Sequence, residues 1–160
     1  MELMKRYIFK IIPMVNIDGV MYGNSRCDIT GSDTNRKWTK HPNSPLYPII
    51  SAIRKLVNNL VHEGYEIEYY IDLHGHSRKL NSFIYACKTY DEIESRLFCW
   101  IMSKINPIFS FEECRFGISP YRKETARGYM NNILTNRKSM TVETSFFGYK
   151  TANGVKPFQK

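Results

Sequence analysis

The stretch that decides the fold is Glu66-Ile67-Glu68-Tyr69-Tyr70-Ile71-Asp72-Leu73-His74-Gly75-His76. Its β-branched and aromatic residues predict a strand over residues 66–73 that runs into His74. Asp72, His74 and His76 alternate with apolar residues, and Gly75 lets the backbone approach a ligand closely. Because ligands and metals are commonly held at the ends of strands in open α/β sheets, this strand end is the first candidate site.

On both sides of this stretch, predicted helices alternate with predicted strands. The spacing of apolar residues predicts an amphipathic helix that begins at Pro48 and ends at Gly64. A second helix is predicted after an Asp91 cap and before Pro107, with a buried stripe made of Ile93, Leu97, Trp100 or Ile101, and Ile105. The remaining predicted elements are strands over residues 82–87 and 139–147 and a helix over residues 122–136.

The N-terminal third of the chain has two contrasting parts. Residues 7–15 are β-branched and aromatic and mostly apolar on both faces, which predicts a buried strand in a sheet covered on both sides. Residues 16–48 are rich in polar residues, Gly and Pro, and a loop of this length is usually functional in a compact domain. The alternation of elements therefore predicts an α/β fold, with a mixed β-sheet covered by helices on both faces.

The composition is that of one globular domain. The 160 residues are 42% hydrophobic and 24% charged, and no segment approaches the ~20 apolar residues that span a bilayer. The four cysteines form no Cys-x-x-Cys pair, which favours reduced thiols in a cytoplasmic protein over a cysteine-based metal site. The charged N-terminus gives no indication of a secretory signal.

The net charge of +8 is the one unusual total. Positive charge attracts any polyanion, whether nucleic acid, a membrane surface or an acidic protein tail. The basic residues are spread along the chain without a block of like charge, so charge alone does not choose a partner. A basic nucleic-acid-binding domain is one reading of this charge, and nothing else supports it.

Three further positions carry side chains suited to chemistry. Glu143 lies within a predicted strand, where a carboxylate must be paired or have a perturbed pKa. In the polar loop, Arg36 beside Asn35 can hold a carboxylate through parallel hydrogen bonds, and Arg26 can stabilise an oxyanion. Each of these features also has an ordinary structural explanation, namely a buried salt bridge or a polar surface loop.

Taken together, five stretches resemble the cytosolic carboxypeptidases, the deglutamylase branch of the zinc metallocarboxypeptidases. The stretches follow the order of that family and cover the chain from about residue 7 to 148. They are Phe9-Lys10-Ile11-Ile12-Pro13-Met14-Val15-Asn16-Ile17-Asp18-Gly19-Val20, Gly23-Asn24-x-Arg26-Cys27, Gly31-x-Asp33-x-Asn35-Arg36, Asp72-Leu73-His74-Gly75-His76-Ser77 and Val142-Glu143-Thr144-x-Phe146. The resemblance implies that the α/β fold is part of a zinc carboxypeptidase catalytic domain.

The resemblance also implies roles for individual residues. His74 would be a zinc ligand, and Glu143 the general base that activates a water molecule. Arg26 would polarise the scissile carbonyl and hold its oxyanion. Asn35 and Arg36 would bind the free C-terminal carboxylate of the substrate, which is the requirement that makes the reaction an exopeptidase one.

The substrate preference implied by the resemblance is for acidic residues. Lys123 and Arg127 match the basic segment to which that family owes this preference, and their spacing of four would place them on one helix face. A phenol that closes over the substrate would be Tyr121 or Tyr129. The implied partners are acidic or glutamylated C-terminal tails such as those of tubulin, and the implied location is the cytoplasm.

The resemblance fails at one point that matters for catalysis. The family's His-x-x-Glu pair, which supplies two of three zinc ligands, has no counterpart before Asn16. We therefore expect residues 1–160 to be a single partial domain, without the N-terminal zinc-ligand segment and the final helix, and with an incomplete ligand set for one zinc ion. We also expect this chain by itself to be poorly stable and inactive. The alternative function is a non-catalytic binder of acidic C-terminal tails.

Overall fold

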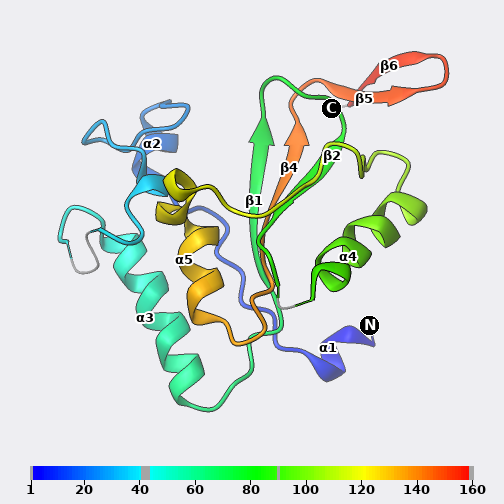
Figure 1. The fold of residues 1–160 in the computed structure, drawn as a ribbon. Helices are drawn as coiled ribbons and strands as arrows, with labels where there is room; N and C mark the ends of the chain where they lie inside the picture. Colours follow the sequence, from blue (N-terminus) through cyan, green and yellow to red (C-terminus); the bar gives the residue numbers. More distant parts are fainter. Residues whose placement is uncertain (1, 41–43, 90, 159–160) are drawn as a thin grey trace.

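A computed structural model describes residues 2–40, 44–89 and 91–158. Within these residues, a four-stranded sheet stands between helices, and a two-stranded hairpin projects from its upper end (Figure 1). The strand order is β1 (Tyr70–His76), β4 (Ser139–Ser145), β2 (Ser82–Ala86) and β3 (Arg115–Phe116). The strand β1 runs parallel to β4, β4 antiparallel to β2, and β2 parallel to β3. The prediction of a mixed sheet with helices on both faces is confirmed.

One face of the sheet is covered by α3 (Pro48–His62) and α5 (Ala126–Ile133) (Figure 1). The helix α3 ends before Gly64, which has the positive φ of 86° that favours glycine. The apolar cluster on this side consists of Trp38, Tyr47, Ile50, Ile53, Val57, Ala126 and Met130. The predicted helix from Pro48 to Gly64 is therefore confirmed, with Ile50, Ile53 and Val57 on its buried side.

The other face is covered by α4 (Glu92–Ile105). Its N-cap is Asp91, as predicted, whose carboxylate accepts a hydrogen bond from the Ile93 backbone N–H at 2.8 Å. The predicted buried stripe is wrong, because Ile93 and Ile105 are 72% and 71% exposed, and Leu97, Trp100 and Ile101 are also exposed. Cys99 faces the sheet instead and packs in a cluster with Phe83, Ile84, Ala86, Phe109, Cys114 and Met140. The apolar periodicity of α4 fits either side of the helix, and packing against β2 selects the Cys99 side.

The predicted strand over residues 7–15 is also wrong. After α1 (Leu3–Arg6), the chain runs as irregular backbone along the molecule, with Ile8 and Ile11 68% and 81% exposed. Described residues 8–15 make no backbone hydrogen bond. Apolar composition cannot by itself create a strand, because a strand needs a neighbouring ladder to pair its backbone groups.

The polar stretch over residues 16–48 is mostly loop, as predicted, and its residues 41–43 lie outside the described residues. It contains two short helices, α2 (Ile17–Met21) and η1 (Thr34–Arg36). The C-terminal hairpin consists of β5 (Gly148–Thr151) and β6 (Gly154–Pro157). Among the described residues, no helix has the length and apolar character needed to cross a membrane.

The predicted helix over residues 122–136 is two elements. A 3-10 helix, η2 (Pro120–Glu124), is followed by α5, and extended Thr125 separates them with φ −80° and ψ 163°. The Thr125 hydroxyl accepts a hydrogen bond from the Gly128 backbone N–H at 3.2 Å and so caps α5. The direction of the chain therefore changes between Lys123 and Arg127, which affects the candidate site directly.

Candidate active site

The site is built on two neighbouring parallel strands. In the register of β1 and β4, His74 lies opposite Glu143, and Asp72 lies opposite Thr141. Because side chains alternate between the faces of a strand, Asp72, His74 and Glu143 share one face, the side that α5 covers. The sheet therefore brings together two residues that are 69 positions apart in the sequence, and both were predicted to act in the site.

His74 lies between two carboxylates. Its Nε2 is 2.9 Å from Asp72 Oδ2, and its Nδ1 is 4.0 Å from Glu143 Oε1. The hydrogen bond to Asp72 raises the pKa of His74 above its ordinary value, and the charge of Glu143 adds to this, whereas burial opposes it. Asp72 thus fixes the ring orientation and leaves Nδ1 facing Glu143, as an orienting carboxylate does for many metal-bound histidines.

Glu143 is almost completely buried, with 8% of its surface exposed. Burial raises the pKa of its carboxyl above the ordinary value, while the charges of His74, His76 and Arg122 act in the opposite direction. A carboxylate with a raised pKa is a stronger base than an ordinary glutamate. Its environment therefore suits the predicted role of general base.

The described residues do not fit a zinc ion on their own. A catalytic zinc site has three protein ligands and an open position, and within residues 2–40, 44–89 and 91–158 no group of three or more His, Cys, Asp or Glu side chains is placed to hold a metal. His76 is not a second ligand in this arrangement, because its Nδ1 accepts hydrogen bonds from the backbone N–H groups of Arg78 and Lys79 at 3.2 and 3.0 Å. His74 would be one ligand of a zinc ion, and the described residues place no further ligands beside it.

The polar loop brings Arg26 towards the strands. The positive charge of Arg26 lowers the pKa of His74, which places the guanidinium in the electrostatic reach of the imidazole. The side chain is held by Asp33, whose Oδ2 is 2.7 Å from Arg26 Nε. Arg26 also lines a hollow of about 380 Å³ along the loop from Asn24 to Gly31. Arg26 thus lies within electrostatic reach of His74, and its predicted role in polarising a carbonyl remains a prediction.

Asn35 and Arg36, the predicted carboxylate binders, are tied to η2 and α5. Asn35 Oδ1 accepts a hydrogen bond from the Ala126 backbone N–H at 2.8 Å, so its amide nitrogen is left for a ligand. Arg36 lies 5.3 Å from the ring centroid of Tyr121. Its Nη1 donates to the Asn35 carbonyl at 2.8 Å, and its Nε has no hydrogen-bond partner among the described residues. An unpaired guanidinium nitrogen is consistent with carboxylate binding.

The two candidate tyrosines lie in different environments. Tyr121 is 70% exposed and stacks on Arg36, beside the predicted carboxylate binders. Tyr129 belongs to the apolar cluster, 5.9 Å from the ring of Trp38 and 4.4 Å from the guanidinium of Arg54. Position therefore favours Tyr121 as the phenol that faces a substrate.

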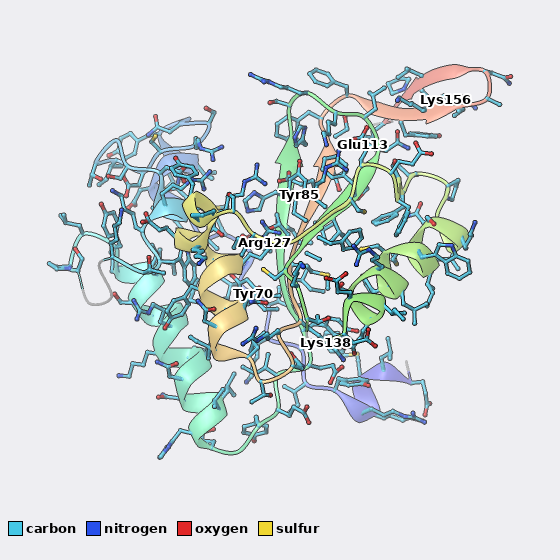
Figure 2. All side chains as sticks on the ribbon, in the orientation of Figure 1. Tyr70, Tyr85, Glu113, Arg127, Lys138 and Lys156 are labelled. Atoms are coloured by element: carbon cyan, nitrogen blue, oxygen red, sulfur yellow. The ribbon has the colours of Figure 1, made fainter. Side chains whose placement is uncertain are left out.

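The prediction that Lys123 and Arg127 share a helix face is wrong, because Thr125 separates the two elements that carry them. Lys123 is exposed on η2, whereas Arg127 is only 3% exposed and donates to the Ala86 carbonyl at 3.1 Å. Arg127 lies at the ring of Tyr85, beside the sheet (Figure 2). Arg122, which the sequence reasoning missed, lies over the same ring. The Phe83–Tyr85 alternation, which predicts that these residues share a sheet face, was the signal that could have found Tyr85.

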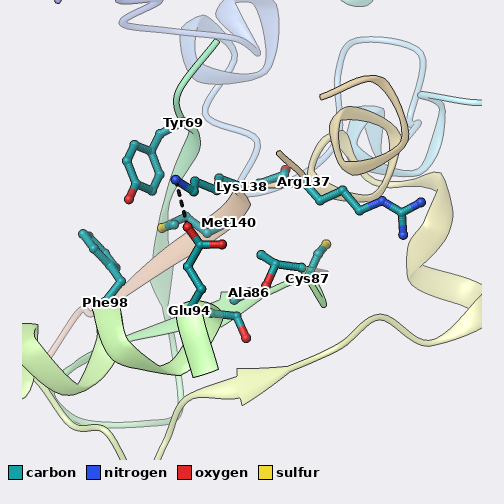
Figure 3. A pocket seen from close by; sticks show the side chains of 11 residues that line it. Tyr69, Ala86, Cys87, Glu94, Phe98, Arg137, Lys138 and Met140 are labelled. Atoms are coloured by element: carbon teal, nitrogen blue, oxygen red, sulfur yellow. Dashed lines mark ion pairs between the residues drawn. The ribbon is translucent and has the colours of Figure 1, made fainter. Parts of the chain in front are cut away.

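A separate small cavity lies away from these residues (Figure 3). It has a volume of about 30 Å³ and lies near the start of β4, between α4 and the Arg137–Met140 segment. Its lining includes Lys138, which forms ion pairs with Glu68 and Glu94 at 2.8 and 3.0 Å. The volume suits about one water molecule, so this cavity is not a substrate site.

Comparison with known proteins places these observations in one family. Residues 1–158 match the family described as zinc carboxypeptidase. Cytosolic carboxypeptidase 3 of Mus musculus is 37% identical over 155 residues, which are 92% of this chain and 15% of the relative. Cytosolic carboxypeptidase 4 of Homo sapiens is 34% identical over 162 residues, which are 91% of this chain and 14% of the relative. The chain thus spans about one seventh of the length of these curated relatives.

Solved structures support the same fold. A metallo-carboxypeptidase from Burkholderia cenocepacia superposes with a TM-score of 0.70 at 19% identity, over 92% of this chain and 38% of that one. A putative carboxypeptidase A from Shewanella denitrificans superposes with a TM-score of 0.68 at 22% identity, over 91% of this chain and 39% of that one. The similarity in sequence and the similarity in fold therefore agree.

Proposed function

Because the chain belongs to the zinc carboxypeptidase family, we propose that it forms part of the catalytic domain of an enzyme that removes C-terminal glutamate or other acidic residues from proteins. The observation that carries this proposal is the facing pair of His74 and Glu143 on β1 and β4, with Arg26 within electrostatic reach of His74. Three kinds of group that peptide hydrolysis requires, a base, an oxyanion-stabilising cation and a metal-binding nitrogen, thus meet at one strand end.

Selection for a free C-terminus rests on the loop that contains η1. The Arg36 guanidinium can form parallel hydrogen bonds to a carboxylate, and Asn35 can donate one more from its amide nitrogen. Both side chains are held in place through η2 and α5, by the Tyr121 ring and the Ala126 N–H. A substrate carboxylate bound there would orient the last peptide bond towards Glu143.

Zinc is the metal of the family, and in the bound state it supplies Lewis-acid polarisation. His74 is the described residue that would contact it, through the Nδ1 that faces Glu143. The other ligands are not among the described residues. What the chain itself contributes is a buried base, one oriented imidazole and the cations that bind the substrate.

Acidic substrates are the finer part of the proposal. The buried Arg127 and the exposed Arg122 of η2 are within electrostatic reach of Glu143, and a net charge of +8 attracts acidic tails. The relatives are named cytosolic carboxypeptidases. We therefore propose acidic or glutamylated C-terminal tails, such as those of tubulin, as substrates, deglutamylation as the reaction, and the cytoplasm as its location.

A second candidate function is a non-catalytic binder of acidic C-terminal tails. The specific observation in its favour is the lack of a complete metal-binding group among the described residues. Binding of a carboxylate through Arg36 and Asn35, which contact Tyr121 and the Ala126 backbone N–H, would need no metal. The two candidates share a ligand and differ in turnover.

One experiment tests both candidates. The protein that contains this chain is given peptides ending in glutamate, with either a free or an amidated C-terminus, and with either added zinc or a chelator. Binding and glutamate release are both measured. The matched variants are Glu143→Gln, which removes the base, and Arg36→Gln, which removes the carboxylate-binding guanidinium.

For the enzyme, we expect zinc-dependent release that requires a free C-terminus and falls by about 10²–10⁴ in Glu143→Gln, while Arg36→Gln weakens binding. For the binder, we expect binding in chelator, still dependent on the free carboxylate, with no release under any condition. If the protein neither binds nor cleaves the peptide with a free terminus, both candidates are wrong.

A further inference from the structure

All four cysteines of the chain are free thiols, and two of them meet in the core. Cys99 lies on α4 and Cys114 directly before β3, and they are 1% and 4% exposed. Both belong to the apolar cluster between the sheet and α4, which lies beside β2 (Figure 1). A hydrogen bond joins their side chains. Two sulfur atoms from separate elements are therefore in contact.

Cys114 Sγ is held by the edge of the sheet. It accepts a hydrogen bond from the Ile84 backbone N–H at 3.3 Å. Two residues earlier on the same edge of β2, the Ser82 N–H donates to the Ile108 carbonyl at 3.0 Å. The Cys114 sulfur thus takes the place that a carbonyl oxygen occupies at Ser82. A sulfur atom that accepts hydrogen bonds from two donors is stabilised in its ionised form.

The surroundings of the two thiols favour ionisation of Cys114 over Cys99. The hydrogen bond from Cys99 lowers the pKa of the Cys114 thiol, and burial opposes this. The Ile84 N–H and the positive charges of Arg115 and Lys79 lower it further. The same hydrogen bond raises the pKa of Cys99, and burial adds to this. Because the thiolate is the nucleophile of cysteine chemistry, Cys114 would react before Cys99.

Cys87 shows what burial does to a thiol outside this pair. It is 1% exposed, like Cys99. Its Sγ donates to the Arg127 carbonyl at 3.9 Å. Burial raises the pKa of its thiol, and the charge of Arg127 opposes this only in part. Cys87 is therefore the ordinary unreactive kind of buried cysteine and a matched control for the pair.

We propose that Cys99 and Cys114 form an oxidation site, at which a hydroperoxide converts the two thiols into a disulfide between α4 and the segment before β3. With hydrogen peroxide, the Cys114 thiolate attacks one oxygen, so an S–O bond forms as the O–O bond breaks. The departing hydroxide takes up the thiol proton and leaves as water. The Cys99 sulfur then attacks Cys114, so an S–S bond forms, the S–O bond breaks and a second water leaves. Two thiols are oxidised and one peroxide is reduced.

The position of Cys114 in the chain gives a small oxidant a route to it. Its neighbours Arg115 and Glu112 are exposed, so only a short surface segment covers the thiol pair. Local opening of such a segment needs less free energy than unfolding of the whole domain. Disulfides in reducing compartments are usually transient, and a pair that closes on oxidation and reopens on reduction fits that pattern.

The test follows the disulfide in the full protein. The reduced, folded protein is treated with hydrogen peroxide in chelator, its remaining thiols are alkylated, and it is digested with trypsin. Trypsin releases Cys99 and Cys114 in separate peptides, residues 97–104 and 105–115, each with one cysteine. We expect mass spectrometry to find these peptides linked and dithiothreitol to separate them. The oxidised protein should also unfold at a higher urea concentration, because the disulfide restricts the unfolded chain.

Three substitutions separate the two steps. Cys99→Ser keeps a donor to Cys114 but cannot close a disulfide, so we expect Cys114 to stop at the sulfenic acid, which dimedone labels. In that variant, labelling at Cys114 should exceed labelling at Cys87 by about tenfold or more. Cys114→Ser should give neither link nor label in residues 105–115, and Cys87→Ser should form the link as the wild type does. Far-UV circular dichroism checks each fold, and the link in the wild type needs no substitution.

Several results would overturn the inference. One is the absence of the linked peptides from peroxide-treated folded protein, or their appearance only after unfolding in urea. Another is equal labelling of Cys87 and Cys114 in Cys99→Ser, because burial alone would then set both reactivities. A third is a link that forms only between protein molecules, seen as a covalent dimer on a non-reducing gel. Peptide binding and glutamate release are measured separately, so these results leave the proposed function untouched.

Discussion

At the scale of single residues, Asp28 shows how one carboxylate can hold a functional loop. Its Oδ1 accepts hydrogen bonds from the Thr30 backbone N–H at 2.9 Å, the Thr30 hydroxyl at 2.7 Å and the Ser32 backbone N–H at 3.1 Å. Burial alone would raise the pKa of Asp28, but these hydrogen bonds lower it below its ordinary value. The turn that they close lies between Arg26 and Asp33, which form an ion pair, and the charge of Arg26 acts on His74.

We expect Asp28→Ala to lower the free energy of unfolding by about 1–3 kcal/mol at pH 7, because buried donors lose their acceptor. The pKa of Asp28 is depressed in the folded state, so this stabilisation is present above the ordinary value of 3.8 and is lost as the pH falls through the folded pKa. Urea unfolding at pH 7 and pH 3 measures the difference.

The Asp28→Asn variant is the matched control, because its amide oxygen can still accept hydrogen bonds from Thr30 and Ser32. It should be less destabilised than Asp28→Ala at pH 7. An Asp28→Ala variant that is equally destabilised at both pH values would contradict the assigned role of the charged carboxylate.

The individual residues that sequence could place were those at the ends of strands. His74 and Glu143 lie opposite each other, because each stands at a fixed place in a strand and strand registers are regular; their roles in a site remain predictions. Arg122 was not predicted, because its position depends on a turn at Thr125 that breaks the expected helix. Helical periodicity predicted that Lys123 shares a face with Arg127. Packing instead places the neighbouring residue, Arg122, over the same ring as Arg127.

At the scale of elements, the junction between η2 and α5 controls where the site cations lie. Gly128 allows close contact, since a Cβ atom there would lie 2.7 Å from the backbone oxygens of both Arg122 and Lys123. These oxygens belong to the main chain of η2 and cannot rotate away as a side chain can. The position of Arg122 over Tyr85 therefore depends on the absence of a side chain on α5.

We expect Gly128→Ala to lower the free energy of unfolding by about 1–3 kcal/mol through overpacking, although alanine favours helices. The same change should push η2 outward and reduce the preference for a C-terminal Glu. Chemical unfolding measures the stability, and titration with two free-terminus peptides, one ending in Glu and one in Gln, measures the preference. Asn132→Ala, on the exposed side of α5, is the control, and a Gly128→Ala variant more stable than wild type would refute this account.

The elements themselves were largely predictable where local signals agreed with packing. The helix α3 and the strands β1, β2 and β4 all lie within or next to their predicted ranges. The segment over residues 7–15 was not predictable, because its apolar pattern specifies burial but no ladder pairs with it. For α4 the apolar residues fit two faces, and only tertiary contact with β2 chose between them.

At the scale of the whole molecule, the outer side of α4 differs most from the prediction, because residues predicted to be buried are exposed to solvent. Large apolar side chains follow its length, with Ile101 44% exposed and Ile105 71% exposed. Exposed apolar stripes of this kind promote association in water. The expectation that this chain by itself is poorly stable is consistent with such a surface, and it remains a prediction.

We expect the double substitution Ile101→Lys and Ile105→Lys to raise the monomer fraction of the isolated chain without changing its far-UV circular dichroism, because the apolar stripe loses its continuity. Analytical ultracentrifugation measures the change. Asn58→Lys with Asn59→Lys on α3 adds the same charge at polar positions. An equal gain of monomer in that control would show that charge alone is responsible.

Finally, β1 is an edge strand of the four-stranded sheet, so backbone amides on its two sides differ in their protection from exchange with solvent. The Tyr70 backbone N–H donates to the Lys138 carbonyl, and the two-residue period then directs the amides of Asp72, His74 and His76 towards β4. The amides of Ile71, Leu73 and Gly75 are directed away from every described strand. We therefore expect amide exchange rates, measured by hydrogen–deuterium exchange and NMR, to alternate along β1. Exchange should be slow at Asp72, His74 and His76 and fast at the residues between them. Uniformly slow exchange would reveal a further ladder on that rim, and the imidazole of His74 would then be held by strands on both sides.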